Sequence, residues 1–160
     1  MTRSTIFSVL AVLSLLVQAT VVSAAIEPGT YMIRSEDGGL AIGPVPLIWP
    51  PPDVPARVMN FMVERWNVAK NEDGFFTITE LRGGYKVVQR RENDIFVSQK
   101  TELALPLAIE PVGNNQYTIS VANKDRFFTY QPEDPPPIVL QPDHGAESQK
   151  WTFVRADREL

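Results

Sequence analysis

The stretches GTYMI (residues 29–33), GFFTI (74–78) and NQYTI (115–119) follow one pattern: a turn residue comes first, an aromatic residue third and isoleucine fifth. Their isoleucines are 45 and 41 residues apart. Side chains two positions apart lie on the same face of a β-strand. Each stretch is therefore predicted to be a strand that turns its aromatic residue and its isoleucine toward the core.

A second series of sequence motifs recurs with nearly the same spacing as the first. The triplets WNV (66–68), LAI (107–109) and WTF (151–153) begin 41 and 44 residues apart, and the first two each begin 12 residues before an isoleucine of the first series. A fixed period indicates equivalent structural units. Three units of this length, with short alternating runs of β-branched and aromatic residues, predict an all-β protein with the β-trefoil fold. Such a fold has three four-stranded repeats and six hairpins, and Trp66 and Trp151 are expected in its core.

Turn-forming residues fall between the predicted strands, as hairpins require. They are Asp37-Gly38-Gly39, Asp73-Gly74, Gly83-Gly84, Gly113-Asn114-Asn115 and Asn123-Lys124-Asp125. A closed barrel leaves few exposed sheet edges, which benefits a protein that has no disulfide to hold it together.

The N-terminal residues have the features of a secretory signal peptide. Arg3 precedes an apolar run over residues 6–17, and Val22 and Ala24 fit a cleavage site after Ala24. A membrane span needs a longer run, uninterrupted by polar residues. We therefore expect residues 1–24 to be removed and residues 25–160 to form a single secreted domain, monomeric and without membrane attachment.

The composition excludes several classes of function. The 160 residues include no cysteine, so disulfides, thiolate nucleophiles and zinc fingers are excluded. A formal net charge of -4 gives no global positive field, and nucleic-acid binding is not expected. The single histidine, His144, lies in a turn-like setting, and no nucleophile elbow, phosphate-binding loop or zinc-hydrolase motif occurs. The sequence therefore predicts neither an enzyme nor a bound metal or cofactor.

The remaining charged clusters are interpreted as solvated turns. This applies to the acid pairs Glu36-Asp37, Glu72-Asp73 and Glu133-Asp134 and to Arg90-Arg91.

Proline is frequent, with 14 residues, and most of them fall in two clusters. The first lies in residues 43–57, between the predicted second and third strands, and the second in residues 132–142. Because proline fixes φ and has no N–H, both clusters are predicted to be stiff loops or strand edges. The first also carries Leu47, Ile48 and Trp49. Apolar side chains on a stiff loop indicate a binding surface, although they could instead cover one end of the barrel.

The order and spacing of these features, from Gly29 to Val154, resemble the fungal β-trefoil protease inhibitors. The cospin-type serine protease inhibitors, relatives of the mycocypins, are most similar. The matching motifs are GTYMI (29–33), ERWNV (64–68), QKWTF (149–153) and the acidic-proline stretch EDPPP (133–137). The resemblance implies a cysteine-free, stable, non-enzymatic domain. It also implies a reactive residue on the loop between the second and third strands, which is the first proline cluster here.

The predicted reactive loop comprises Pro44, Val45, Pro46, Leu47, Ile48, Trp49 and Arg57. A substrate-like inhibitor fills the protease cleft with a rigid loop that is already in its bound shape. Leu47–Ile48 is the preferred reactive bond, because Pro46 favours an extended chain before it and Ile48 has an ordinary amide. It would suit a chymotrypsin-like serine protease. Val45–Pro46 for an elastase-like enzyme and Arg57–Val58 for a trypsin-like enzyme are alternatives.

The sequence is compatible with two other binding functions. Ricin B-like lectins share the trefoil and often carry Gln-x-Trp near the end of each unit. Only Gln149-Lys150-Trp151 matches fully, whereas Glu64-Arg65-Trp66 and Leu105-Pro106-Leu107 depart from the motif. Inhibition of cysteine proteases, as by the mycocypins, would use other loops of the same barrel.

Overall fold

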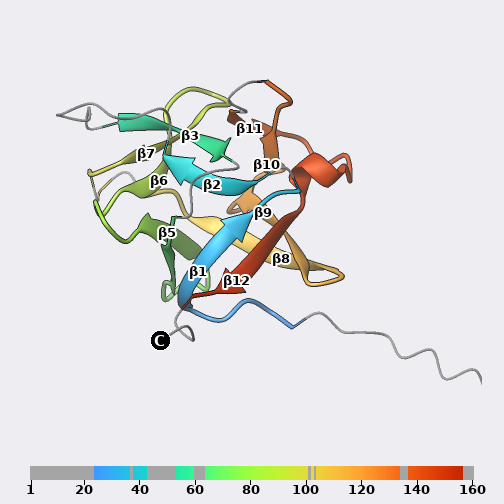
Figure 1. Cartoon of the computed structure of the whole chain (residues 1–160), viewed down its shortest axis with the longest axis horizontal. Helices are drawn as coiled ribbons and strands as arrows, with labels where there is room; N and C mark the ends of the chain where they lie inside the picture. The colour runs from blue at the N-terminus through green and yellow to red at the C-terminus, as the bar shows by residue number, and fades with distance from the viewer. Residues whose placement is uncertain are drawn as a thin grey trace, which may run out of the picture.

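The computed structural model of the chain describes residues 24–36, 38–42, 53–59, 64–100, 102, 104–133 and 137–156. They form twelve strands and the short 3-10 helix η2 (Glu147–Gln149) (Figure 1). The strands are β1 (Gly29–Arg34), β2 (Gly39–Ile42), β3 (Asp53–Met59), β4 (Trp66–Lys70), β5 (Phe76–Glu80), β6 (Lys86–Gln89), β7 (Ile95–Ser98), β8 (Leu107–Gly113), β9 (Gln116–Val121), β10 (Phe127–Tyr130), β11 (Ile138–Gln141) and β12 (Trp151–Arg155). Within the described residues, no helix has the length and apolar character needed to cross a membrane.

Six strands close into a barrel. β1 pairs with β4, β4 with β5, β5 with β8, β8 with β9, β9 with β12, and β12 again with β1. Each sequence unit thus supplies its first and fourth strands to the ring. The two series of repeated motifs occupy these six strands, and the prediction of an all-β fold with a closed barrel is confirmed.

The second and third strands of each unit form a hairpin that caps one end of the barrel. These hairpins are β2–β3, β6–β7 and β10–β11. β3 also pairs with β7. Pro137, the residue before β11, bridges to Arg57, and Val139 of β11 bridges to Asp94. In Figure 1 these strands lie at the upper end, whereas β1 begins and β12 ends at the lower one.

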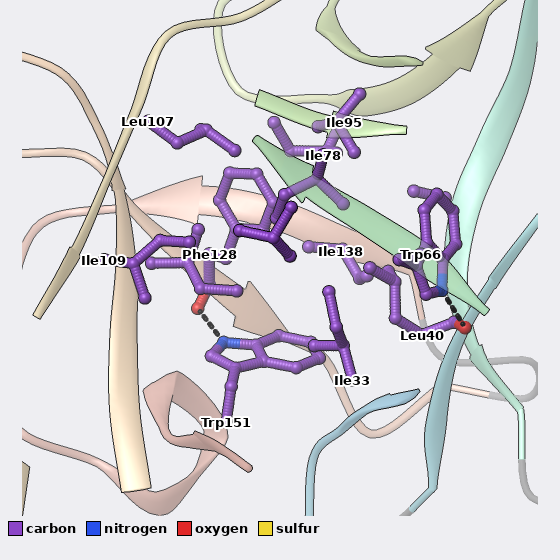
Figure 2. Packing of buried hydrophobic residues seen from close by; sticks show 14 of the residues in the cluster. Ile33, Leu40, Trp66, Ile78, Ile95, Leu107, Ile109, Phe128, Ile138 and Trp151 are labelled. Atoms are coloured by element: carbon purple, nitrogen blue, oxygen red, sulfur yellow. Dashed lines mark hydrogen bonds between the residues drawn. The ribbon is translucent and has the colours of Figure 1, made fainter. Parts of the chain in front are cut away.

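The predicted core residues are buried. Trp66 and Trp151 are 0% and 1% exposed, and Leu107, which takes the equivalent place in the second unit, is also fully buried. Figure 2 shows how each indole satisfies its polar atom: Nε1 of Trp66 donates to the carbonyl of Leu40, and Nε1 of Trp151 donates to that of Phe128, both at 3.2 Å. Both acceptors lie on the second strand of a unit, so the same contact occurs twice in the three-fold arrangement.

Most of the turn predictions agree with the described backbone, although Gly39 and Gly113 are the end residues of β2 and β8, and Asp37 lies outside the described residues. Asn114 and Asn115, between β8 and β9, have φ values of 51° and 59°, which suit a two-residue hairpin turn. Proline placement differs in one detail, because Pro55 lies within β3 and not in the loop before it. The β2–β3 ladder begins only at the pair Ile42↔Ala56, so no residue of β2 needs an N–H from Pro55.

Candidate functional site

Most of the predicted reactive loop falls between two paired strands. Pro44, Val45, Pro46, Leu47, Ile48 and Trp49 lie outside the described residues, in segment 43–52, which connects β2 to β3. Arg57 is described and lies inside β3, where it pairs with Ala41 and bridges to Pro137. The structure therefore places Arg57 on a strand that is paired on both sides, apart from the segment that carries the other predicted residues.

The C-terminal end of segment 43–52 is attached to the second unit. The last pair between β2 and β3 is Ile42↔Ala56, so the residues before Ala56 have no partner on β2. They pair with β7 instead, with Asp53 opposite Ser98 and Pro55 opposite Phe96. The chain that returns from the segment thus enters a ladder with a neighbouring unit at its first residue, Asp53.

An ion pair reinforces this attachment. Nη2 of Arg90, the residue after β6, contacts Oδ2 of Asp53, and the two side chains are 36% and 22% exposed. The other carboxylate oxygen, Oδ1, is buried and accepts no hydrogen bond from the residues that the structure describes. Both arginines are exposed, as the interpretation of Arg90-Arg91 as a solvated face predicts, with 36% of the Arg90 side chain and 85% of the Arg91 side chain accessible. Arg90 in addition makes this ion pair, which the sequence does not predict.

No local sequence signal identified Arg90. Its partner is in another unit, and the contact depends on the pairing of β3 with β7, which joins strands of two units. Taken alone, the sequence around Arg90-Arg91 and the sequence around Asp53 are each typical of a turn.

A hollow of about 160 Å³ lies where the three cap hairpins meet. Each unit supplies three consecutive residues to it: 55–57, 94–96 and 137–139. The middle residue of each triplet, Ala56, Ile95 or Ile138, is buried in the core. Arg57 and Asp94 are the charged residues of an otherwise apolar lining. Among the residues that the structure describes, no three histidine, aspartate or glutamate side chains gather closely enough to bind a metal ion.

The one full Gln-x-Trp motif has a structural role. Gln149 is 1% exposed, and its Nε2 donates to Oγ1 of Thr129 at 3.0 Å and to the carbonyl of Pro142 at 2.9 Å. Its Oε1 accepts from the backbone N–H of His144 at 3.0 Å. The Gln149 side chain therefore ties the segment before η2 to β10.

We expect Gln149→Ala to destabilise the domain by about 1–3 kcal/mol, because it leaves buried donors and acceptors without partners. Urea unfolding followed by tryptophan fluorescence measures this loss. Glu147→Ala, which alters an exposed side chain of η2, is the control and should change the free energy of unfolding by about 0.5 kcal/mol at most. Equal stabilities of the two variants would contradict the structural role of Gln149.

Sequence comparisons give no relative: no protein-family model matches the chain. No curated protein matches it either.

Solved structures do match. A proteinase inhibitor from Coprinopsis cinerea aligns over 82% of this chain and 100% of its own, with a TM-score of 0.68 and 19% identity. The ricin B-like lectin of Macrolepiota procera, solved with lactose, aligns over 83% and 100%, with a TM-score of 0.61 and 13% identity. The designed three-fold symmetric protein ThreeFoil aligns over 80% and 99%, with a TM-score of 0.64 and 11% identity. At these identities the likeness shows the fold, and the chain is a β-trefoil protein.

Proposed function

We propose that this chain, after removal of residues 1–24, is a secreted inhibitor of serine proteases that fills the protease cleft with the segment between β2 and β3. The observation that carries the proposal is the placement of a proline-rich, apolar segment between two strands of the cap. Segment 43–52 contains five prolines together with Leu47, Ile48 and Trp49, and β3 is paired as soon as the segment ends. The structural likeness to the Coprinopsis cinerea proteinase inhibitor supports this choice among trefoil functions.

Stiffness is what such a segment contributes to inhibition. Each proline restricts φ and lowers the conformational entropy of the free chain, so less entropy is lost when a protease binds it. Attachment of Asp53 to β7 adds to this by fixing where the segment returns to the barrel.

Leu47–Ile48 remains the proposed reactive bond. A protease binds an extended chain whose backbone N–H and C=O groups are free to pair with the enzyme. Arg57–Val58 is a poorer candidate, because Arg57 pairs within the cap and Val58 is only 2% exposed. Val45–Pro46 is also poorer, since proline follows the bond. A chymotrypsin-like enzyme, which prefers a large apolar residue, is therefore the proposed target.

A panel of proteases tests the function. Residues 25–160 are assayed against chymotrypsin-, elastase- and trypsin-like serine proteases and papain-like cysteine proteases, in parallel with a glycan array. We expect nanomolar to micromolar inhibition of at least one serine protease, strongest for the chymotrypsin-like enzyme. Inhibition restricted to cysteine proteases, or a blank panel with a positive array, would overturn the proposal.

Secretion makes a separate prediction at the N-terminus. The protein recovered from the medium of a eukaryotic host should begin at Ala25, which N-terminal sequencing determines. In the structure, the Tyr117 hydroxyl donates to the carbonyl of Ala24 at 3.0 Å, and cleavage would remove this acceptor. Ile26, 7% exposed in the core cluster, would stay attached. Recovery only from cells, with Met1 retained, would contradict this prediction.

A further inference from the structure

We propose that Asp53 and Arg90 are a positioning pair that holds the C-terminal end of the inhibitory segment, a role that rests on the function proposed above. Asp53 is the first residue of β3 and therefore the first described residue after segment 43–52. Its carboxylate contacts the guanidinium of Arg90 from the second unit. The pair thus joins the end of the segment to a part of the barrel that is distant in sequence.

Both partners are carried by hydrogen-bonded backbone. Asp53 is opposite Ser98, a residue of β7 that is fully buried. The N–H of Arg90 donates to the carbonyl of Asp94 at 3.2 Å, directly beyond the ladder pair Gln89↔Ile95 of the β6–β7 hairpin. The ion pair therefore links two points whose backbone positions are fixed by other contacts, through side chains that are 36% and 22% exposed.

The sequence before Asp53 leaves few other ways to fix this end. Residues 50–52 are all proline and have no N–H to donate to a neighbouring strand. The β2–β3 ladder stops at Ala56, so the segment's own hairpin partner does not reach Asp53. Among the residues that the structure describes, Asp53 is held by its pairing with β7 and by its side chain.

The carboxylate is sensitive to the loss of Arg90. Oδ1 of Asp53 is buried without a hydrogen bond from the described residues, and the ion pair is made by Oδ2. Removing the guanidinium leaves the Asp53 carboxylate partly buried, with no partner among the described residues for either oxygen. A buried charge in that state is unfavourable, so the carboxylate moves toward water. That movement would displace the first residue of β3 and, with it, the end of the segment.

Displacement of this end of the segment would affect the inhibitor after a protease has cleaved it. Hydrolysis of Leu47–Ile48 adds one water molecule and leaves a carboxylate on Leu47 and an ammonium group on Ile48. Resynthesis expels that water, and it is favoured when the two new ends stay in register. Residues 48–52 remain attached through Asp53, so the pair acts on the Ile48 end of the proposed reactive bond.

The test compares Arg90→Gln with Arg91→Gln in residues 25–160. Arg91 is the matched control, because it is the next residue, has the same charge and is 85% exposed. Three quantities are measured: the inhibition constant for the protease inhibited best, the ratio of cleaved to intact inhibitor at equilibrium with catalytic protease, and the melting temperature. We expect Arg90→Gln to weaken inhibition and to raise the cleaved-to-intact ratio, each by about fivefold, while Arg91→Gln stays within about twofold of wild type. The charge-reversed double variant Asp53→Arg/Arg90→Asp should recover part of both losses.

The outcomes separate this inference from the proposed function. If the unmodified protein inhibits no protease, the function fails and the positioning role fails with it. If the unmodified protein inhibits but Arg90→Gln matches Arg91→Gln, the positioning role alone is wrong. A lower melting temperature for Arg90→Gln with an unchanged cleaved-to-intact ratio also overturns it, because a merely structural pair would give that result.

Discussion

Replacing Leu47 with glycine should weaken inhibition of a chymotrypsin-like protease by about 100-fold or more. The side chain before the reactive bond fills the primary pocket of the protease, and truncating such a central anchor costs about 2–4 kcal/mol of binding free energy. Glycine also makes the chain more flexible, which reduces its preorganisation. The inhibition constant of the variant against the same enzyme gives the measurement.

A matched control separates this effect from unfolding. Leu81, in the turn after β5, is 50% exposed, and Leu81→Gly removes the same side chain from a different surface position. It should inhibit within about threefold of the unmodified protein, because it lies outside the proposed contact. Full inhibition by Leu47→Gly would rule out Leu47–Ile48 as the reactive bond. Substitution of Val45 by glycine, assayed against an elastase-like protease, would then test Val45–Pro46 as the reactive bond.

Truncating Trp151 to alanine should cost about 3–5 kcal/mol of stability, among the largest losses expected from a single change in the described core. The indole is 1% exposed, and its Nε1 satisfies the carbonyl of Phe128, so the change opens a cavity and leaves a buried acceptor unpaired. For a domain of this size, the loss corresponds to a fall in melting temperature of about 10 °C or more. Calorimetry and denaturant unfolding measure it.

The third tryptophan provides the contrast. Trp49→Ala falls in the proposed inhibitory segment and should change the melting temperature by only a few degrees, at about 0.5–1 kcal/mol. It should instead affect inhibition. A loss of stability at Trp49 as large as at Trp151 would contradict its assignment to a binding surface, and would favour the alternative in which it covers one end of the barrel.

The fold was predictable because its units repeat in the sequence. Ile33, Ile78 and Ile119 are each at most 1% exposed, as their shared register predicted. Leu107 is equally buried where the other units have tryptophan, so the register of the repeat was more informative than residue identity. Asparagine and glycine marked the turns, since few other residues tolerate positive φ.

Contacts between units were not predictable in the same way. The pairing of β3 with β7 and the bridge Arg57↔Pro137 join chain segments with no common local pattern. Proline cannot donate a hydrogen bond, so the sequence predicts a loop or a strand edge for Pro55; it lies instead in β3, opposite Phe96 of β7, and is tolerated because the ladder with β2 begins only at Ala56. The position of the proposed inhibitory segment follows from the order of the strands. The contact between Arg90 and Asp53 follows only from the three-dimensional arrangement.

Closure of the barrel by its first and last strands has a consequence for how the protein is made. β1 pairs with β12 over four residues, and Arg155 reaches back to the carbonyl of Pro28, 127 residues away. Contacts of such long sequence separation slow folding, because the chain loses entropy before the contacts form. The first unit, which bears the proposed inhibitory segment, obtains β12 as a neighbour only when residues 151–155 have been synthesised. A nascent chain therefore carries this segment on an incomplete barrel until β12 has been made.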